Sequence, residues 1–309
     1  MGGKIPSERE NLMSWDVRGK NILVTGATSG IGLEASVALA RSGARVLMVG
    51  RDPVRTEAAV ADVKARSGSA DVSHLLCDFS SQAEIRRLAA AVLARHDRLH
   101  VLVNNAGAVN KKRLLTVDGI ERTFAVNHLG YFLLTRLLCD LLERSAPARV
   151  VTVASIGHRQ GTLDFADLGF ERGYRIMRAY ARSKLANVLF AAELARRLAG
   201  TGVTSNSLHP GAVATHIWSG APTWAKPVIF LLLRPSFVSA EEGARTIVQL
   251  AASPELAGVT GLYFEKGVPV APSPLAQDEV LARRLWEVSS ELVGLPVGLP
   301  PTILGASAS

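Results

Sequence analysis

The stretch Asn21-Ile-Leu-Val-Thr-Gly-Ala-Thr-Ser-Gly-Ile-Gly32 joins a mostly apolar run to a turn rich in glycine, and a helical pattern follows from Leu33 to Ser42. A strand, a glycine-rich turn and a helix in this order predict a cradle for a dinucleotide. Glycines let the backbone approach a pyrophosphate, and a helix N-terminus offers amide donors. The glycine spacing differs from G-x-G-x-x-G, so the mechanism of that motif applies but its spacing does not. Taken alone, the element could also be a tight turn without a ligand.

Strand-like runs alternate with helical patterns along the chain. The runs lie at 21–25, 45–49, 73–78, 101–103, 149–154 and 204–209, and a run at 261–264 would add an edge strand. This alternation predicts an α/β fold in a single domain, a doubly wound (Rossmann) parallel sheet of about seven strands with helices on both faces. We expect ligands at the carboxyl ends of the strands, where the winding reverses.

The domain is expected to span residues 19–294, because no linker or internal repeat divides the chain. Residues 1–18 would form an N-terminal extension. Residues 295–309 would form a C-terminal tail that frays, since glycine and proline become frequent after Val293.

Composition excludes several classes of protein. With 48% hydrophobic and 20% charged residues, the chain has ample material for a buried sheet. The formal charge of +8 could suggest nucleic acid, yet basic residues are scattered and Lys111-Lys-Arg113 is the densest cluster. That cluster is best explained as a solvated loop, or as help in attracting a phosphate-rich cofactor. We therefore expect no nucleic-acid partner.

Cysteine and histidine give no metal site. Cys77 and Cys139 have neither a disulfide framework nor a ligand spacing and are expected in the core, and the seven histidines are dispersed. Residues 1–16 lack the features of a signal peptide, and no apolar run approaches the roughly 20 residues that span a bilayer. The expected location is cytoplasmic.

Tyr180-Ala-Arg-Ser-Lys184 places a phenol and an ammonium four residues apart, one turn along a helix face. A neighbouring cation stabilises a phenolate and lowers the pKa of the tyrosine. Such a tyrosine can protonate a carbonyl oxygen or deprotonate an alcohol. The spacing also arises by chance in many helices, so its meaning depends on the motifs around it.

Five motifs stand in the order of a short-chain dehydrogenase/reductase, and the chain resembles that family from about Gly19 to Leu292. They are the glycine turn Thr25–Gly32, Asn104-Asn-Ala-Gly107, Ser155, Tyr180-x-x-x-Lys184 and Pro210-Gly211. Within the family the chain is most similar to the retinol-dehydrogenase-like group. That similarity lies in Tyr180-Ala-Arg-Ser-Lys-Leu-Ala-Asn187, Ser207-Leu-His-Pro-Gly211 and Arg284-Leu-Trp-Glu-Val-Ser-Ser290.

The resemblance implies four catalytic residues. Ser155 ends a strand and would orient the substrate carbonyl, and Tyr180 would give or take the proton. Lys184 would lower the pKa of Tyr180 and bind the nicotinamide ribose. Asn127, within a helical pattern, matches the family member that holds a water leading protons to the lysine. A helix kink or a satisfied polar group is the alternative for Asn127.

The resemblance also implies the residues that contact the cofactor. These are Gly26, Thr28, Ser29, Gly30, Ile31, Gly32, Arg51, Asp78, Phe79, Asn105, Ala106, Gly107, Tyr180, Lys184, Pro210, Gly211, Val213 and Thr215. His209, just before the last group, is expected to be a packing residue.

The end of the second strand, Val49-Gly50-Arg51-Asp52, indicates which nicotinamide cofactor is bound. Gly50 stands where a carboxylate would accept hydrogen bonds from the ribose of NAD(H). The Arg51 guanidinium can instead pair with a 2′-phosphate. We therefore expect NADP(H) to be preferred over NAD(H), although Asp52 would invert the argument if the register shifted by one residue.

Two variable segments would shape the substrate site. The glycine-punctuated segment between Ser155 and Tyr180 is expected to be a loop over the site, and about 215–236, with its apolar run 228–233, a substrate lid. An apolar lid suits a lipophilic aldehyde, ketone or alcohol, with retinoid-like and long-chain compounds included. The run could also touch a membrane surface peripherally, while core or dimer packing is the more ordinary explanation.

The sequence thus predicts an NADP(H)-dependent oxidoreductase acting on CH–OH or C=O groups, a carbonyl reductase or the reverse alcohol dehydrogenase. A protein that binds NADP(H) as a sensor or scaffold with little turnover is the alternative, and the intact Ser155, Tyr180 and Lys184 argue against it. The resemblance also suggests a homodimer that forms through the helix carrying the tyrosine and its neighbour.

Overall fold

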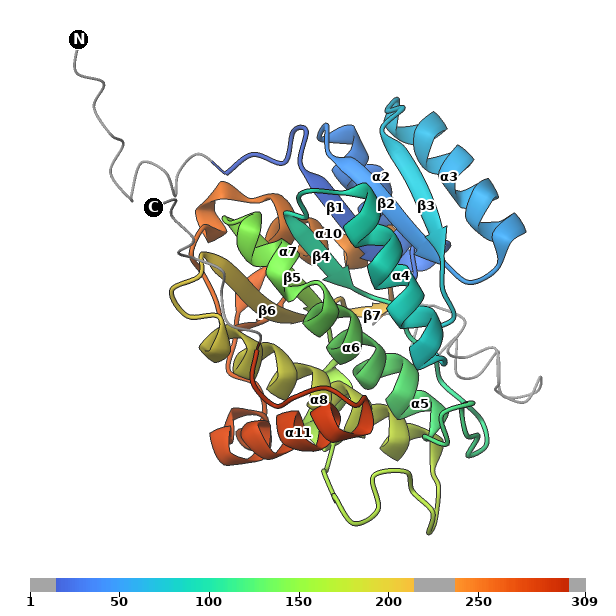
Figure 1. The fold of residues 1–309 in the computed structure, drawn as a ribbon, viewed down its shortest axis with the longest axis vertical. Helices are drawn as coiled ribbons and strands as arrows, with labels where there is room; N and C mark the ends of the chain where they lie inside the picture. The colour runs from blue at the N-terminus through green and yellow to red at the C-terminus, as the bar shows by residue number, and fades with distance from the viewer. Residues whose placement is uncertain (1–14, 214–236, 300–309) are drawn as a thin grey trace, which may run out of the picture.

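The apolar runs of the sequence become strands of one main sheet in the computed structural model, which describes residues 15–213 and 237–299 (Figure 1). The strands are β1 (Asn21–Thr25), β2 (Arg45–Gly50), β3 (Val72–Leu76), β4 (Val101–Asn104), β5 (Ala148–Val153), β6 (Val203–His209), β9 (Tyr263–Glu265) and β10 (Val268–Pro269). Their spatial order is β10-β9-β6-β5-β4-β1-β2-β3, and all neighbours are parallel except β9 and β10. The winding reverses beside β1, which confirms the doubly wound sheet.

One edge of the sheet differs from the prediction. The described residues form an eight-stranded sheet, because the chain turns back after β9 and adds β10 as an antiparallel edge. The turn residues Lys266 and Gly267 have φ of 50° and 79°. Two consecutive positive φ values are the geometry of a tight hairpin turn. The run at 261–264 is therefore covered on both sides and is not the edge strand.

Helices cover both faces of the sheet. On one face lie α2 (Gly30–Arg41), α3 (Pro53–Ser67) and α10 (Ala240–Ala252), and on the other α4 (Gln82–Arg95), α6 (Gly130–Leu137), α7 (Cys139–Arg144) and α8 (Ile176–Arg197) (Figure 1). Each face has its own apolar cluster, because side chains alternate along a strand: Leu102 points to the α8 side and Val103 to the α2 side. Cys77 and Cys139 are buried, as expected.

Shorter elements connect these layers. They are α5 (Arg122–Phe124), the π-helical turn η1 (Ala125–Leu129), the 3₁₀ turns η2 (Ile156–Gln160), η5 (Pro254–Leu256) and η6 (Pro274–Gln277), and a second, parallel sheet of β7 (Ala212–Val213) and β8 (Phe237–Val238). Within residues 15–213 and 237–299, no helix is both long and apolar enough to cross a membrane. The proposed lid at 215–236, including the run 228–233, lies outside the described residues.

The C-terminal helix α11 (Glu279–Leu292) packs across α8 (Figure 1). Its Trp286 is buried and stacks on Phe190 of α8 with ring centroids 6.0 Å apart, and meets Phe132 of α6 edge-on at 4.9 Å. Part of the face on which the expected homodimer would form is thus covered within the chain.

The expectation that the chain frays from Leu295 is wrong for residues 295–299. Trp286 Nε1 donates to the carbonyl of Val297 over 2.7 Å. The buried guanidinium of Arg136 on α6 donates to the carbonyls of Pro296 and Gly298. These bonds fix the segment against the helices, which a count of glycine and proline does not reveal.

Candidate active site

The glycine-rich turn between β1 and α2 is built for close backbone approach. Gly26 and Gly30 have φ of 64° and 57°, a region that glycine adopts without strain. A Cβ on Gly26 would lie 2.7 Å from Ala106 Cα, and one on Gly32 would lie 2.4 Å from Asn105 Nδ2. Only glycine fits these two positions without displacing its neighbours.

The N-terminus of α2 has the character of an anion site. Its N-cap residue Ser29 is extended, and the hydroxyl makes no capping hydrogen bond within the described residues. The first amides of the helix therefore face the cavity without a side-chain partner from the cap. This arrangement fits the pyrophosphate of a dinucleotide.

Asn105 fastens the end of β4 to this turn. Its Nδ2 donates to the carbonyls of Thr25 and Gly26, at 2.8 and 3.1 Å. The Thr25 hydroxyl in turn accepts from the amides of Asn105 and Ala106. Thr25, the first residue of the glycine-rich motif, is thus a structural residue of the cradle. This role was not predicted, since only the fold brings Thr25 beside the end of β4.

The adenosine end predicted for the cofactor lies at the carboxyl ends of β2 and β3. A Cβ on Gly50 would lie 2.2 Å from Thr56 Oγ1 and 2.5 Å from Thr28 Cγ2, so no carboxylate could stand there without rearrangement. Asp52 caps α3 by accepting from the amide of Arg55 at 2.9 Å. The carboxylate that could have reversed the cofactor argument is thus used by the helix.

Arg51 is exposed and lies 3.8 Å from the carboxylate of Asp78. Burial acts to raise the pKa of Asp78, but hydrogen bonds from Ser80 and the charge of Arg51 outweigh it, so the pKa is lowered. The side chain of Phe79 is buried in the core against Gly130. Its predicted contact with the cofactor stays a prediction and would have to be made by the backbone.

Three of the four predicted catalytic residues, Ser155, Tyr180 and Lys184, line one cavity of about 480 Å³ at the carboxyl edge of the sheet, and Asn127 does not line it. The cavity is lined by Gly26, Thr28, Ser29, Gly30, Ile31, Asn105, Gly107, Ala108, Val109, Val153, Ala154, Ser155, Tyr180, Lys184, His209, Pro210 and Gly211. The glycine cradle and the Ser155, Tyr180 and Lys184 side chains therefore share one space, as the motif order predicted.

Ser155 follows β5 and caps η2. The amide of Gly157 donates to Ser155 Oγ over 3.1 Å. Because this bond occupies an acceptor site of the hydroxyl, the Ser155 proton remains available for a bound oxygen.

Lys184 is buried and donates from Nζ to the carbonyl of Val153 over 2.9 Å. Burial lowers its pKa to about 7. Its Nζ lies 5.7 Å from the centroid of the Tyr180 ring. Asn187, one turn along α8, donates to the same carbonyl at 3.2 Å and shares the anchoring of this region.

The expectation of a lowered pKa for Tyr180 is not met in this structure. Burial raises the pKa of Tyr180, and the Ser155 hydroxyl acts in the opposite direction with a smaller effect. Burial also disfavours the charge of Lys184, and a neutral amine does not stabilise a phenolate. The spacing of Tyr180 and Lys184 along the sequence does not show that both side chains are buried and that burial disfavours the charged form of each.

Asn127 lies in the π-helical turn η1 rather than in a regular helix. Its Oδ1 accepts from the amide of Ala108 at 2.7 Å, and its Nδ2 donates to the carbonyl of Ala108 and to Ser183 Oγ, both at 3.0 Å. The side chain thus ties the loop after β4 to α8. Its predicted role toward a water molecule stays a prediction.

The loop after β6 completes the cavity. Gly211 has φ of 92°, and a Cβ there would lie 2.6 Å from Val238 Cγ2. Val213 belongs to β7, while Thr215 lies outside the described residues. Burial lowers the pKa of His209, whose ring lies at the cavity wall.

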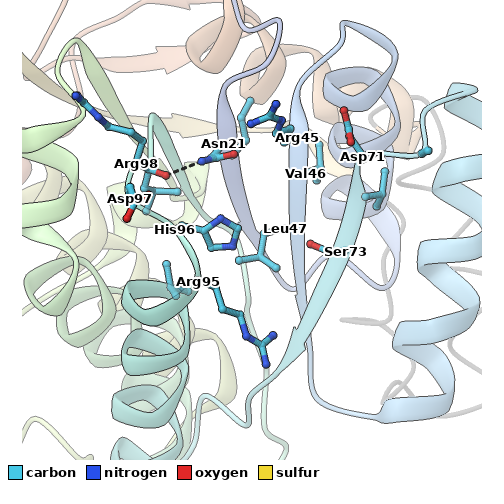
Figure 2. Close-up of a pocket in the computed structure, with 15 residues that line it drawn as sticks. Asn21, Arg45, Val46, Leu47, Asp71, Ser73, Arg95, His96, Asp97 and Arg98 are labelled. Carbon is cyan, nitrogen blue, oxygen red and sulfur yellow. Dashed lines mark hydrogen bonds between the residues drawn. The ribbon is translucent and has the colours of Figure 1, made fainter.

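A second hollow, of about 560 Å³, lies at the opposite edge of the sheet (Figure 2). It forms around Asn21 and Arg45, the first residues of β1 and β2, and the end of α4 at Arg95. Asn21 Nδ2 donates to the carbonyl of Arg98 across its rim over 2.8 Å. Because this is the amino edge, none of the predicted site residues that the structure describes lines this hollow.

The described residues contain no group of three or more His, Cys, Asp or Glu side chains that could hold a metal ion. The side chains of Ser155, Tyr180 and Lys184 bring a hydroxyl, a phenol and an ammonium to the cavity beside the glycine-rich turn.

Comparison with known proteins gives a consistent result. A family model for short chain dehydrogenases matches residues 20–226. Human retinol dehydrogenase 13 is 41% identical over 303 residues, which cover 95% of this chain and 88% of that protein. Human WW domain-containing oxidoreductase is 42% identical over 294 residues, which cover 92% of this chain and 70% of that protein.

Solved structures share the fold. An uncharacterised protein from Mycobacterium paratuberculosis aligns with a TM-score of 0.75 and 32% identity, over 94% of this chain and 98% of that chain. RhlG of Pseudomonas aeruginosa, in an active-site complex with NADP, aligns with a TM-score of 0.66 and 26% identity, over 86% and 98%.

Proposed function

This chain belongs to the short-chain dehydrogenase family, in its retinol-dehydrogenase-like group, and we propose that it is an NADP(H)-dependent oxidoreductase acting on a lipophilic aldehyde, ketone or alcohol. The observation that carries the proposal is the convergence of Ser155, Tyr180 and Lys184 on the cavity that the glycine cradle opens into. The cofactor supplies or accepts the hydride, and the residues below bind, orient and move a proton.

Ser155 and Tyr180 act on the substrate oxygen. The Gly157 amide occupies one side of the Ser155 hydroxyl, which then donates to the carbonyl and stabilises its growing negative charge. Tyr180 delivers the proton to that oxygen during reduction and removes it during oxidation. Burial raises the pKa of Tyr180, so at neutral pH the phenol holds the proton that a reduction needs.

Lys184 supports Tyr180 and the cofactor. With a pKa near 7 it exchanges its proton easily around neutral pH, which suits a group that returns protons to Tyr180. Its ammonium also has a donor left for a ribose hydroxyl, since the bond to Val153 uses only one of three. Asn127 links the loop after β4 to α8 by hydrogen bonds to Ala108 and Ser183.

The cofactor is proposed to be NADP(H) rather than NAD(H). Gly50 has no space for a carboxylate, Asp52 is used as a helix cap, and the exposed Arg51 can pair with a 2′-phosphate. RhlG of Pseudomonas aeruginosa holds NADP in its active-site complex, and its likeness to this chain supports the same choice.

The substrate is proposed to be lipophilic, with retinoid-like or long-chain carbonyl compounds as the leading class. The names of the retinol dehydrogenase relatives and the apolar run 228–233 support this proposal. The cytoplasmic location, the homodimer and the peripheral membrane contact stay predictions.

The test is NADPH oxidation by the wild type and Tyr180→Phe with a panel of short aldehydes, long-chain aldehydes, aryl ketones and retinal, with NADH alongside. We expect turnover that prefers NADPH, rises with chain length and falls about 10²- to 10⁴-fold in the variant. Equal rates in Tyr180→Phe would remove the assigned acid. Tight NADPH binding with no turnover of any carbonyl would favour the sensor or scaffold.

A further inference from the structure

Gly157 lies between the two side chains that are proposed to act on the substrate oxygen. A Cβ at this position would lie 3.5 Å from Ser155 Oγ and 3.6 Å from Tyr180 Cε1. Both are ordinary van der Waals separations, so a methyl group would fit without moving either residue. A carbonyl that accepts hydrogen bonds from both Ser155 and Tyr180 would lie beside this point, at the rim of the cavity that these two residues line.

The backbone does not require a glycine here. Gly157 is not among the glycines with positive φ, in contrast to Gly26, Gly30 and Gly211. A Cβ would also meet no atom closer than 3.5 Å, in contrast to Gly26, where Ala106 lies at 2.7 Å. Neither strain nor close packing requires a glycine at position 157, so the missing side chain leaves the point beside Ser155 Oγ and Tyr180 Cε1 unfilled.

Hydrogen bonds and close packing fix the turn that carries Gly157. His158 is buried, its Nδ1 lies 2.7 Å from the carbonyl oxygen of Ser155, and its Nε2 accepts from the amide of Ser273 at 3.1 Å. Gly161, at the end of the turn, is pressed against α8, where an added Cβ would lie 2.6 Å from a backbone carbonyl. Because the turn is fixed, a side chain added at position 157 could not move away and would occupy space next to the reacting carbonyl.

We infer that Gly157 is a specificity-determining residue: its missing side chain leaves room for a second carbon substituent on the reacting carbon, so the site accepts ketones and secondary alcohols as well as aldehydes. The inference rests on the proposed function and concerns the size of the substrate next to the transferred hydride. The inference does not depend on the remainder of the substrate, which a lid would contact.

The experiment compares benzaldehyde with acetophenone, which differ by one methyl group on the reacting carbon. In Gly157→Ala, kcat/KM for acetophenone should fall about tenfold or more, while that for benzaldehyde stays within about threefold. Gly157→Ser should retain the same order with a larger loss for the ketone. Gly169→Ala is the matched control, because that glycine also has no positive φ and has space for a Cβ, but lies against Arg113.

Equal losses for both carbonyls, or no loss for the ketone, would overturn the inference. Thermal unfolding establishes that each variant is folded. Calorimetric binding of both carbonyls to the enzyme with NADP⁺ gives a readout without turnover. If the wild type reduces neither compound, the proposed function fails, and selective loss of acetophenone binding in Gly157→Ala still supports the role of Gly157. Equal binding of acetophenone by the wild type and Gly157→Ala, or no binding by the wild type, refutes the role of Gly157.

Discussion

Asn127 Nδ2 donates to Ser183 Oγ over 3.0 Å, and this bond joins the π-helical turn to the helix that carries Tyr180 and Lys184. Ser183 passes the connection on, because its hydroxyl donates to the carbonyl of Tyr180 over 2.7 Å. On its other side Asn127 holds both polar backbone groups of Ala108, which lines the cavity. One amide therefore sets the position of the proposed acid relative to the cofactor loop.

Asn127→Ala should lower kcat about 10- to 100-fold, because the loop and α8 would lose their common register. It should also lower the free energy of unfolding by about 1–3 kcal/mol, since buried polar groups of Ala108 lose their partners. Steady-state kinetics and urea unfolding measure the two effects. Asn110→Ala is the matched control in the same loop, where the amide reaches Thr123 and not α8. Unchanged kcat in Asn127→Ala would contradict this role.

Arg51→Ala should raise the KM for NADPH about 10- to 100-fold and leave the KM for NADH nearly unchanged, because only NADPH carries the 2′-phosphate with which the guanidinium would pair. Steady-state kinetics with each cofactor at saturating substrate tests this. Arg55→Ala removes a neighbouring exposed arginine from the first turn of α3 and serves as the control. An equal rise in the KM for both cofactors would mean that Arg51 stabilises the end of β2 and does not bind the 2′-phosphate.

The sheet could be predicted from the sequence because most of its strands are mostly apolar runs separated by helical patterns, and the glycine-rich turn marks where the first crossover begins. What could not be predicted depends on few residues. The strand β10 has two residues, too few to show a period. The π-helical turn around Asn127 has the same apolar pattern as the helix that continues it.

The residues that carry the proposed chemistry could be predicted from the sequence, but the residues that position them could not. Ser155, Tyr180 and Lys184 carry groups whose chemistry is evident from residue type, and the motif order places them together. Thr25 and Ser183 act through hydrogen bonds to segments about 80 and 56 residues away, so only the fold assigns them partners. The raised pKa of Tyr180 likewise depends on burial, which spacing along a helix does not determine.

His128 should make the protein less stable in acid. Its ring is fully buried and its pKa is lowered to about 3 from the ordinary 6.5. Between about pH 6.5 and 3 the unfolded chain binds a proton that the folded chain does not, so the free energy of unfolding falls as pH falls through this window. His128→Phe should make that dependence shallower, by up to about 1.4 kcal/mol per pH unit.

Urea unfolding at a series of pH values measures this difference. Phe132→Leu, which alters a ring next to His128 without titrating, should shift stability by a similar amount at every pH. An unchanged pH dependence in His128→Phe would show that the ring titrates in the fold as it does in the unfolded chain.

Trp286→Ala should lower the free energy of unfolding by about 3–5 kcal/mol, because the side chain is 1% exposed and fills the contact between α11, α6 and α8. The variant would also lose the bond to Val297 that holds the C-terminal segment. The uncovered apolar face of α6 and α8 should then favour self-association, measured by sedimentation velocity. Trp15→Ala, which removes a buried tryptophan from the α2 side of the sheet, should destabilise without this change. If both variants kept the sedimentation coefficient of the wild type, α11 would not be what covers an association surface.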